Sequence, residues 1–175
     1  LIGSELSLAN SAGVIGWPAS HANWIRPGLL MYGVSPLMQR STTECDLKPV
    51  MTLRASLIAI QSLQEGDAVG YGATWKASKL TRIGIISVGY GDGYPRHAKE
   101  GTPVLLAGKR VPIVGRVSMD MLTVDLGMDD CFNVGDEAIL WGKGLAVEEI
   151  AECADTIPYE LLCNVARRVA VNYSY

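Results

Sequence analysis

The stretch TPVLLAGKRVPIVGRVSMDMLTVDL (Thr102–Leu126) decides the fold class that we expect for this chain. It contains two short apolar runs on either side of the pair Gly108-Lys109, and a third apolar run closes it. Runs of this kind around a glycine-containing pair predict a β-hairpin, here turning at Gly108-Lys109 and continuing into a third strand. This part of the chain is therefore predicted to be β structure.

The sequence on both sides extends the β pattern. Residues 50–63 alternate and are rich in side chains that favour strands, and a turn at residues 65–67 follows them. Residues 81–90 form a nearly continuous apolar run that predicts a strand before the glycine-rich turn at 91–93, and residues 133–142 add another strand. The later part of the chain is thus expected to be a mainly β domain.

Two helices are predicted near the end of the chain. The first places Val147, Ile150 and Ala154 on one face at helical spacing. The second, over residues 158–169, begins with a proline, which suits a first helical turn, and ends with two arginines, where the helix dipole favours cations. Residues 169–175 are predicted to form a terminal strand.

Residues 1–45 differ from the rest of the chain. They hold two short apolar segments separated by small residues, a pattern that suits the end of an α/β unit. Residues 40–49 are polar and end in proline, which predicts a linker. We therefore expect two domains, 1–45 and 46–175. Because the chain begins with Leu1 rather than methionine, we expect it to be a piece of a longer protein.

The composition excludes several classes of protein. The 175 residues are 49% hydrophobic and 19% charged with a net charge of −3, and the scattered basic residues argue against a nucleic-acid surface or a polybasic membrane patch. No apolar run approaches the roughly 18 residues of a membrane helix. The four cysteines show no C-x-x-C spacing, so we expect reduced, mostly buried thiols in a cytoplasmic protein.

The sequence lacks the residues that a metal site or a catalytic triad would need. The sequence has only His21 and His97, without paired cysteine or glutamate at ligand spacing, so no metal site is predicted. The same shortage argues against a serine or cysteine triad. The stretch GYGDGYPR (Gly89–Arg96) has neither the glycine spacing nor the Lys-Ser/Thr of a phosphate loop, so a strand followed by a turn is the better interpretation.

A candidate anion site lies in the first part of the chain. A Pro-Gly pair turns the backbone closely, so that two successive amides could point together at an anion, and an arginine precedes the pair. An asparagine and a serine upstream add an amide and a hydroxyl. Together these groups would make a phosphate site at the mouth of a barrel. The residues concerned are Asn10, Ser11, Arg26, Gly28 and Leu29.

Two tyrosines stand between glycines. Tyr71 is flanked by Gly70 and Gly72, and Tyr90 repeats the arrangement. Glycine neighbours offer a core tyrosine nothing to pack against, but they let the backbone come close to a ligand. Only about 0.1% of a free phenol is ionised at pH 7, so a tyrosine base would need a nearby cation or hydrogen-bond donor. A rim tyrosine in a glycine-rich bulge is the alternative.

Six stretches occur in order along the chain: SLANSAG, WIRPGLLMYG, VGYGATW, ISVGYGDGYPR, VPIVGRVSMDM and IPYELLC. Together they closely resemble the C-terminal half of bacterial alanine racemases, over essentially the whole chain. The resemblance implies a pyridoxal-phosphate (PLP) enzyme, a homodimer with shared active sites that interconverts L-alanine and D-alanine. It also implies that residues 1–45 are the last strands of a (β/α)8 barrel and that a β-rich, barrel-like C-terminal domain follows.

The resemblance further implies roles for single residues. Ser11, the backbone at Gly28 and Leu29, and Tyr159 in the last helix would bind the PLP phosphate, while Arg26 would face the pyridine nitrogen. A guanidinium does not give up its proton, so the ring would stay unprotonated and act as a weaker electron sink. That suits an enzyme that returns a proton quickly and avoids side reactions.

On the substrate side, Tyr71 would remove and return the α-proton on the L face, acting on the cofactor of the other subunit. The backbone N–H of Met119, with Asp120 beside it, would hold the substrate carboxylate. Tyr90 would line the entryway, and Asn10 would support the phosphate site as part of its motif. The activating group for the tyrosine base is expected outside this chain.

Two features set limits to this resemblance. Ser7 occupies a position where some family members have a histidine that supports the arginine, which leaves the support of Arg26 open. None of the six lysines lies in a motif that matches the Schiff-base lysine, so the isolated chain is expected to be inactive.

The leading hypothesis is therefore part of an alanine racemase that supplies D-alanine for peptidoglycan. A racemase of the same family acting on serine or on larger amino acids is the first alternative, and relative rates on alanine, serine and lysine would separate the two. A non-catalytic β-domain that serves in dimerisation or binding is the second, and the presence of the lysine upstream would exclude it.

Overall fold

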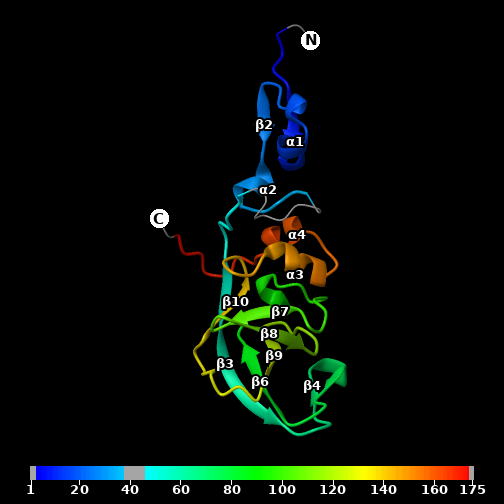
Figure 1. Ribbon diagram of the computed structural model, residues 1–175, viewed down its shortest axis with the longest axis vertical. Helices are drawn as coiled ribbons and strands as arrows, with labels where there is room; N and C mark the ends of the chain where they lie inside the picture. The colour runs from blue at the N-terminus through cyan, green and yellow to red at the C-terminus, as the bar shows by residue number, and fades with distance from the viewer. Residues whose placement is uncertain (1–2, 38–45, 174–175) are drawn as a thin grey trace. The chain divides into compact units, whose positions relative to one another are not determined.

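The computed structural model describes residues 3–37 and 46–173, and the chain divides into two compact units, Leu1–Met51 and Thr52–Tyr175 (Figure 1). The predicted domain boundary, after residue 45, and most of the predicted linker lie outside the described residues.

The first unit is built around a two-stranded parallel sheet. Its strands pair at Ser7 with Trp24 and at Asn10 with Arg26. The side chain of Asn10 caps the first helix, because its Oδ1 accepts the N–H of Gly13 at 3.0 Å. The sequence predicted strands and turns here, and short helices occupy the turns. The elements are β1 (Ser7–Asn10), α1 (Ser11–Gly16), η1 (Pro18–Ser20), β2 (Trp24–Arg26) and α2 (Gly28–Met31).

The second unit is a closed antiparallel barrel of six strands, in the order β10-β3-β6-β9-β8-β7 (Figure 1). Alternate apolar side chains point inward, and Leu57, Ile113 and Leu140 are fully buried. Closure leaves the barrel without an unpaired edge. The predicted mainly β, barrel-like class is confirmed. The strands are β3 (Leu53–Leu63), β6 (Thr81–Ile86), β7 (Pro103–Leu106), β8 (Lys109–Val114), β9 (Leu122–Gly127) and β10 (Glu137–Trp141).

The hairpin at Thr102–Leu126 forms, but its turn lies one residue earlier than predicted. Leu106 pairs with Lys109, so Ala107 and Gly108 are the two turn residues, and Lys109 already belongs to β8. Ala107 has φ 47° and Gly108 has φ 80°. Two positive φ values in a two-residue loop match the twist of the flanking strands, and this geometry set the position of the turn.

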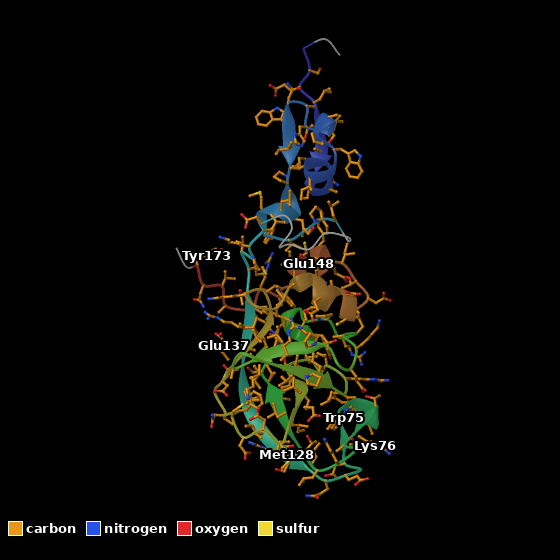
Figure 2. The ribbon with its side chains drawn as sticks, in the orientation of Figure 1. Trp75, Lys76, Met128, Glu137, Glu148 and Tyr173 are labelled. Carbon is orange, nitrogen blue, oxygen red and sulfur yellow. The ribbon has the colours of Figure 1, made fainter. Side chains whose placement is uncertain are left out.

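Single helical turns lie at both of the tyrosines that stand between glycines. A small ribbon of β4 (Ala68–Val69) and β5 (Trp75–Lys76) carries η3 (Tyr71–Ala73) at its tip, so Tyr71 does not lie on a strand. Trp75, labelled in Figure 2, packs its ring against a small buried cluster that includes Val69. The strand predicted to reach residue 90 ends at Ile86, and η4 (Tyr90–Asp92) follows.

The two late helices are α3 (Val147–Cys153) and α4 (Pro158–Cys163), which lie together at one end of the barrel (Figure 1). The predicted face of Val147, Ile150 and Ala154 is buried and is confirmed.

The prediction for the end of the chain was wrong. The second helix stops at Cys163, and no strand forms over residues 169–173. The N–H of Ala166 donates instead to the carbonyl of Asp92 at 2.9 Å, and these contacts with η4 draw the chain away from a helical path. The arginines predicted at a helix end therefore lie in an irregular segment.

The prediction of buried cysteines was also wrong for the described residues. Cys131 and Cys163 are exposed and Cys153 is half-buried, and all three are free thiols. Cys45 lies outside the described residues. In the described part of the chain, no helix has the length and apolarity that crossing a bilayer requires.

Candidate active site

The predicted phosphate-binding residues of the first unit meet where β1 and β2 end. Ser11 is buried, and its Oγ accepts the N–H of Leu30 at 3.3 Å, which places the hydroxyl beside the first turn of α2. The N–H groups of Gly28 and Leu29 have no acceptor among residues 3–37 and 46–173. A Cβ added to Gly28 would meet no atom within 4 Å, so this side of the turn is open. The hydroxyl proton and the two amides form a set of donors suited to a phosphate.

The side chain of Arg26 is held by Ser7, whose supporting role the sequence alone left open. Its Nη1 donates to the carbonyl oxygen and to the Oγ of Ser7, both at 2.8 Å. Strand pairing accounts for this contact, because β1 and β2 are parallel neighbours and Ser7 lies near Arg26 across them. Ser7 thus positions the arginine without a histidine.

Tyr71 lies on a loop whose backbone packs closely against the backbone of residues 115–116. Gly70 has φ 76°, and a Cβ there would lie 3.2 Å from the backbone nitrogen of Arg116. A Cβ on Gly115 would lie 3.0 Å from the carbonyl oxygen of Val69. The glycines therefore let two backbone segments of this unit meet. The Tyr71 side chain is 70% exposed, so the phenol is presented to solvent rather than used for packing.

Tyr90 and Met119 are joined through backbone contacts. The N–H of Tyr90 donates to the carbonyl of Ser118 at 3.0 Å, and the N–H of Gly91 donates to the carbonyl of Met119 at 2.8 Å. A Cβ on Gly89 would lie 2.4 Å from the Met119 carbonyl oxygen, so only glycine permits this approach. The glycine-rich motif around Tyr90 is therefore a packing surface for the Met119 turn.

The Met119 turn leaves its own N–H available. Ser118 holds the turn, because its N–H and Oγ both donate to the carbonyl of Met121, at 2.9 and 2.7 Å. No acceptor for the Met119 N–H exists within the described ranges. The residue as a whole is half exposed.

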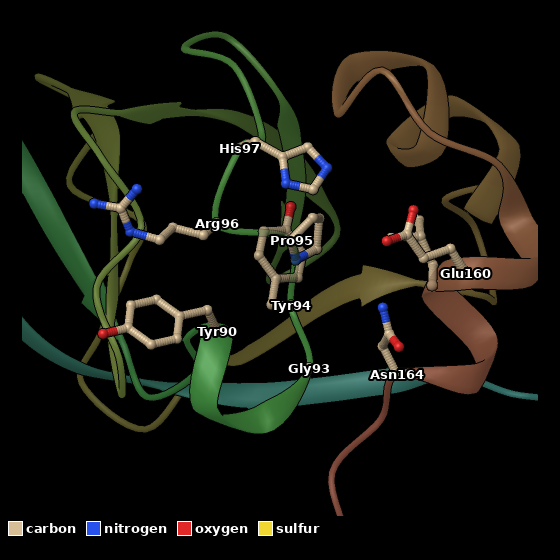
Figure 3. A pocket seen from close by; sticks show the side chains of 9 residues that line it. Tyr90, Gly93, Tyr94, Pro95, Arg96, His97, Glu160 and Asn164 are labelled. Atoms are coloured by element: carbon tan, nitrogen blue, oxygen red, sulfur yellow. The ribbon is translucent and has the colours of Figure 1, made fainter.

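Tyr90 also lines a cavity of about 260 Å³ (Figure 3). In Figure 3, Glu160 and Asn164 face the loop side chains across the cavity. Tyr94 forms part of its wall, and its hydroxyl is buried without a hydrogen-bond partner in the described structure. Burial raises the pKa of Tyr94, with a smaller contribution from Cys153. The lining residues are Tyr90, Gly93, Tyr94, Pro95, Arg96, His97, Glu160, Leu161 and Asn164.

Comparison with known proteins identifies the family. The model of the alanine racemase C-terminal domain matches residues 50–173, and that of the alanine racemase N-terminal domain matches residues 3–36. The chain belongs to the alanine racemase family.

Several alanine racemases are similar over nearly the whole chain. The alanine racemase of Vibrio cholerae serotype O1 is 56% identical over 169 residues, which cover 97% of this chain and 47% of that protein. That of Shewanella amazonensis is 59% identical over 167 residues, covering 95% and 46%. The crystal structure of biosynthetic alanine racemase from Pseudomonas aeruginosa has a TM-score of 0.96 at 51% identity, covering 98% of this chain and 48% of that one. The chain spans about half the length of these relatives.

The residues that the alanine racemase motifs single out fall into two groups. Asn10, Ser11, Arg26, Gly28 and Leu29 lie together in the first unit. In the second unit, Tyr90, Met119 and Asp120 lie together. Tyr71 sits on a separate loop of that unit, and Tyr159 lies half exposed on α4. Because the two groups belong to different units, the joining of Tyr159 to the phosphate group stays a prediction.

The structure adds one residue that the sequence did not single out. Arg168 forms ion pairs with Asp92 and Asp120, at 2.7 Å each, and so contacts the Met119 turn. Sequence reasoning assigned Arg168 to a helix end, and no local signal marks it. Within the described residues, no group of three or more His, Cys, Asp or Glu could hold a metal ion.

Proposed function

We propose that this chain is part of an alanine racemase that interconverts L-alanine and D-alanine with PLP. The single observation that carries the proposal is the match of both alanine racemase domain models to the chain. The exposed Tyr71 and the available Met119 amide support it, because they offer a proton-transfer group and an anion donor. The enzyme would work as a cytoplasmic homodimer and supply D-alanine for peptidoglycan.

The first unit would hold the cofactor phosphate. Ser11 and the amides of Gly28 and Leu29 fit a phosphate by their donors, and Tyr159 would add its hydroxyl. Arg26, fixed by Ser7, would face the pyridine nitrogen and remain charged. When bound, PLP supplies the electron sink that makes the α-proton of an amino acid removable.

The second unit would act on the substrate. The phenol of Tyr71 would take the α-proton of L-alanine and return it, reaching a cofactor held by the other subunit. The N–H of Met119 would donate to the substrate carboxylate, and Tyr90 would line the way in. Such a division of labour makes each site depend on two copies of the enzyme.

The covalent anchor of the cofactor would come from elsewhere in the enzyme. None of the six lysines of this chain lies in a matching motif. We therefore expect the 175-residue chain alone, incubated with PLP and L-alanine, to form no D-alanine. Sustained D-alanine formation would contradict this part of the proposal.

The proposal is tested by Tyr71→Phe in the full-length enzyme in deuterated water. We expect deuterium incorporation into the α-position of L-alanine to fall about 10²- to 10⁴-fold, the usual contribution of a general base. Incorporation into D-alanine should continue, because a second base serves the other face.

The matched control is Tyr173→Phe, which changes a tyrosine that is 84% exposed and outside the candidate site. It should leave deuterium incorporation into both enantiomers unchanged. If Tyr71→Phe also leaves both unchanged, the assignment of Tyr71 as the base is wrong.

A further inference from the structure

Three segments that are distant in sequence meet around η4. The N–H of Gly91 donates to the carbonyl of Met119, and the carbonyl of Asp92 accepts the N–H of Ala166. A Cβ on Gly93, which has φ 98°, would lie 2.1 Å from the carbonyl oxygen of Asn164. The glycine-rich turn is therefore packed between the Met119 turn and the segment that follows α4.

The guanidinium of Arg168 joins these segments. Its Nε donates to Oδ1 of Asp92 and its Nη2 to Oδ1 of Asp120, both at 2.7 Å. The same Nη2 lies 3.5 Å from the carbonyl oxygen of Met119. Nε and Nη2 form one edge of a planar fork, so a single rigid group spans two carboxylates.

Asp92 links Arg168 to the start of η4 by hydrogen bonds. Its Oδ2 accepts the N–H of Gly89 at 2.9 Å, while its Oδ1 receives Arg168, and its side chain is largely buried. Gly89 in turn lies against the backbone of Met119. A chain of short contacts therefore runs from Arg168 through Asp92 to the amide that would receive the substrate carboxylate.

We propose that Arg168 is a positioning residue of the racemase, which fixes the Met119 amide and Tyr90 for the substrate carboxylate by joining Asp92 to Asp120. This inference rests on the proposed function. We assign Arg168 no contact with the substrate itself, because its Nε and Nη2 are already used by two carboxylates.

Charge gives Arg168 a second effect at the same place. Asp92 and Asp120 put two negative charges beside an amide that is meant to receive an anion, and Arg168 offsets one of them. The hydrogen bonds that Arg168 donates to Asp120 and then to Asp92 raise the pKa of Arg168, so it stays charged at any working pH. Removal of Arg168 would loosen the Met119 turn. It would also leave the negative charges of Asp92 and Asp120 to repel the substrate carboxylate.

The test compares Arg168→Ala and Arg168→Lys in the full-length PLP enzyme. The KM for L-alanine should rise roughly 10- to 100-fold in Arg168→Ala, as expected when a binding group is displaced by about 1 Å, while kcat changes less than about threefold. Arg168→Lys should be intermediate, since an ammonium restores the charge but cannot span two carboxylates. The rise should shrink at high ionic strength, where repulsion is screened.

Arg167→Ala is the matched control. Arg167 is the neighbouring arginine, is exposed, and forms no ion pair with a described residue. The KM of the Arg167→Ala variant for L-alanine should equal that of the wild type. If KM in Arg168→Ala also stays within about twofold of the wild type, the proposed role is overturned.

Hydrogen exchange gives a readout that does not depend on activity. Peptides covering Gly89–Gly93 should exchange at least about tenfold faster in Arg168→Ala, because their bonds to Met119 and Asp92 open more often. The Gly101 amide, bonded to Ile113 in the barrel, should be unchanged. Unchanged exchange at Gly89–Gly93 would overturn the structural half of the inference. A wild-type enzyme inactive on alanine would instead overturn the proposed function, and the substrate role with it.

Discussion

The first unit leaves many of its large apolar side chains exposed to solvent, whereas the strands of the barrel bury most of theirs. Leu8, Trp17 and Trp24 of the first unit are 59–63% exposed. In the barrel, by contrast, Leu57 and Ile113 are completely buried. Both units are rich in apolar residues, so the difference lies in architecture rather than in composition.

Sheet closure accounts for the difference. Six antiparallel strands that close on themselves form an inside and satisfy every backbone edge. A parallel pair such as β1 and β2 needs layers on both faces, and two strands alone are marginal. The barrel is therefore a self-sufficient core, while the first unit presents a surface that requires a cover.

The largest expected effect is in hydrogen exchange of the 175-residue chain. Amides of β6 and β9 should exchange on the order of 10³-fold or more slowly than those of β1 and β2, because they open only with the whole barrel. The measurement is made at a dilution at which light scattering shows a monomer. Equal protection of both units in a monomer would contradict the contrast.

A smaller effect is expected from one core substitution. Leu57 is fully buried, and its Cδ1 lies only 2.7 Å from where a Cβ on Gly84 would be, so it fills the space that this glycine leaves. Leu57→Ala should reduce the free energy of unfolding by about 2–5 kcal/mol in urea denaturation. The control Leu8→Ala, at a 63% exposed position, should change it by less than about 0.5 kcal/mol. Similar losses for both variants would mean that the first unit has a core of its own.

Local sequence predicted the barrel well and the ends of its elements less well. The apolar alternation that placed β3, and the spacing of Val147, Ile150 and Ala154, both correspond to burial in the structure. Local patterns failed where distant contacts decide the path. The second helix stops at Cys163 because the following residues bond to η4, which lies far away in the sequence.

The candidate site shows the same limit. Motifs could place Ser11 and Met119, because each is marked by its neighbours in sequence. They could not show that Ser7 holds Arg26, which depends on the pairing of β1 with β2. Nor could they find Arg168, since its two carboxylate partners are 76 and 48 positions away. Contacts of that kind become visible only in the folded chain.

The smallest expected effect is on the barrel surface, at the ion pair of Lys109 and Asp129. Lys109 Nζ lies 2.6 Å from Asp129 Oδ2, and the Cys131 N–H donates to the other oxygen. The hydrogen bond from Lys109, followed by those from Cys131, lowers the pKa of Asp129 to about 2. The folded state therefore binds fewer protons here than the unfolded one.

The pair should then stabilise the barrel above about pH 4, the ordinary pKa of an aspartate, and lose its effect as the pH falls towards 2. NMR titration of the Asp129 carboxyl checks this, with an expected midpoint near 2. Added salt should move the midpoint towards the ordinary value, because both side chains are largely exposed and screening weakens their attraction. A midpoint near 4 at low salt would mean that the pair does not persist in solution. This ion pair would then add nothing to the stability of the barrel.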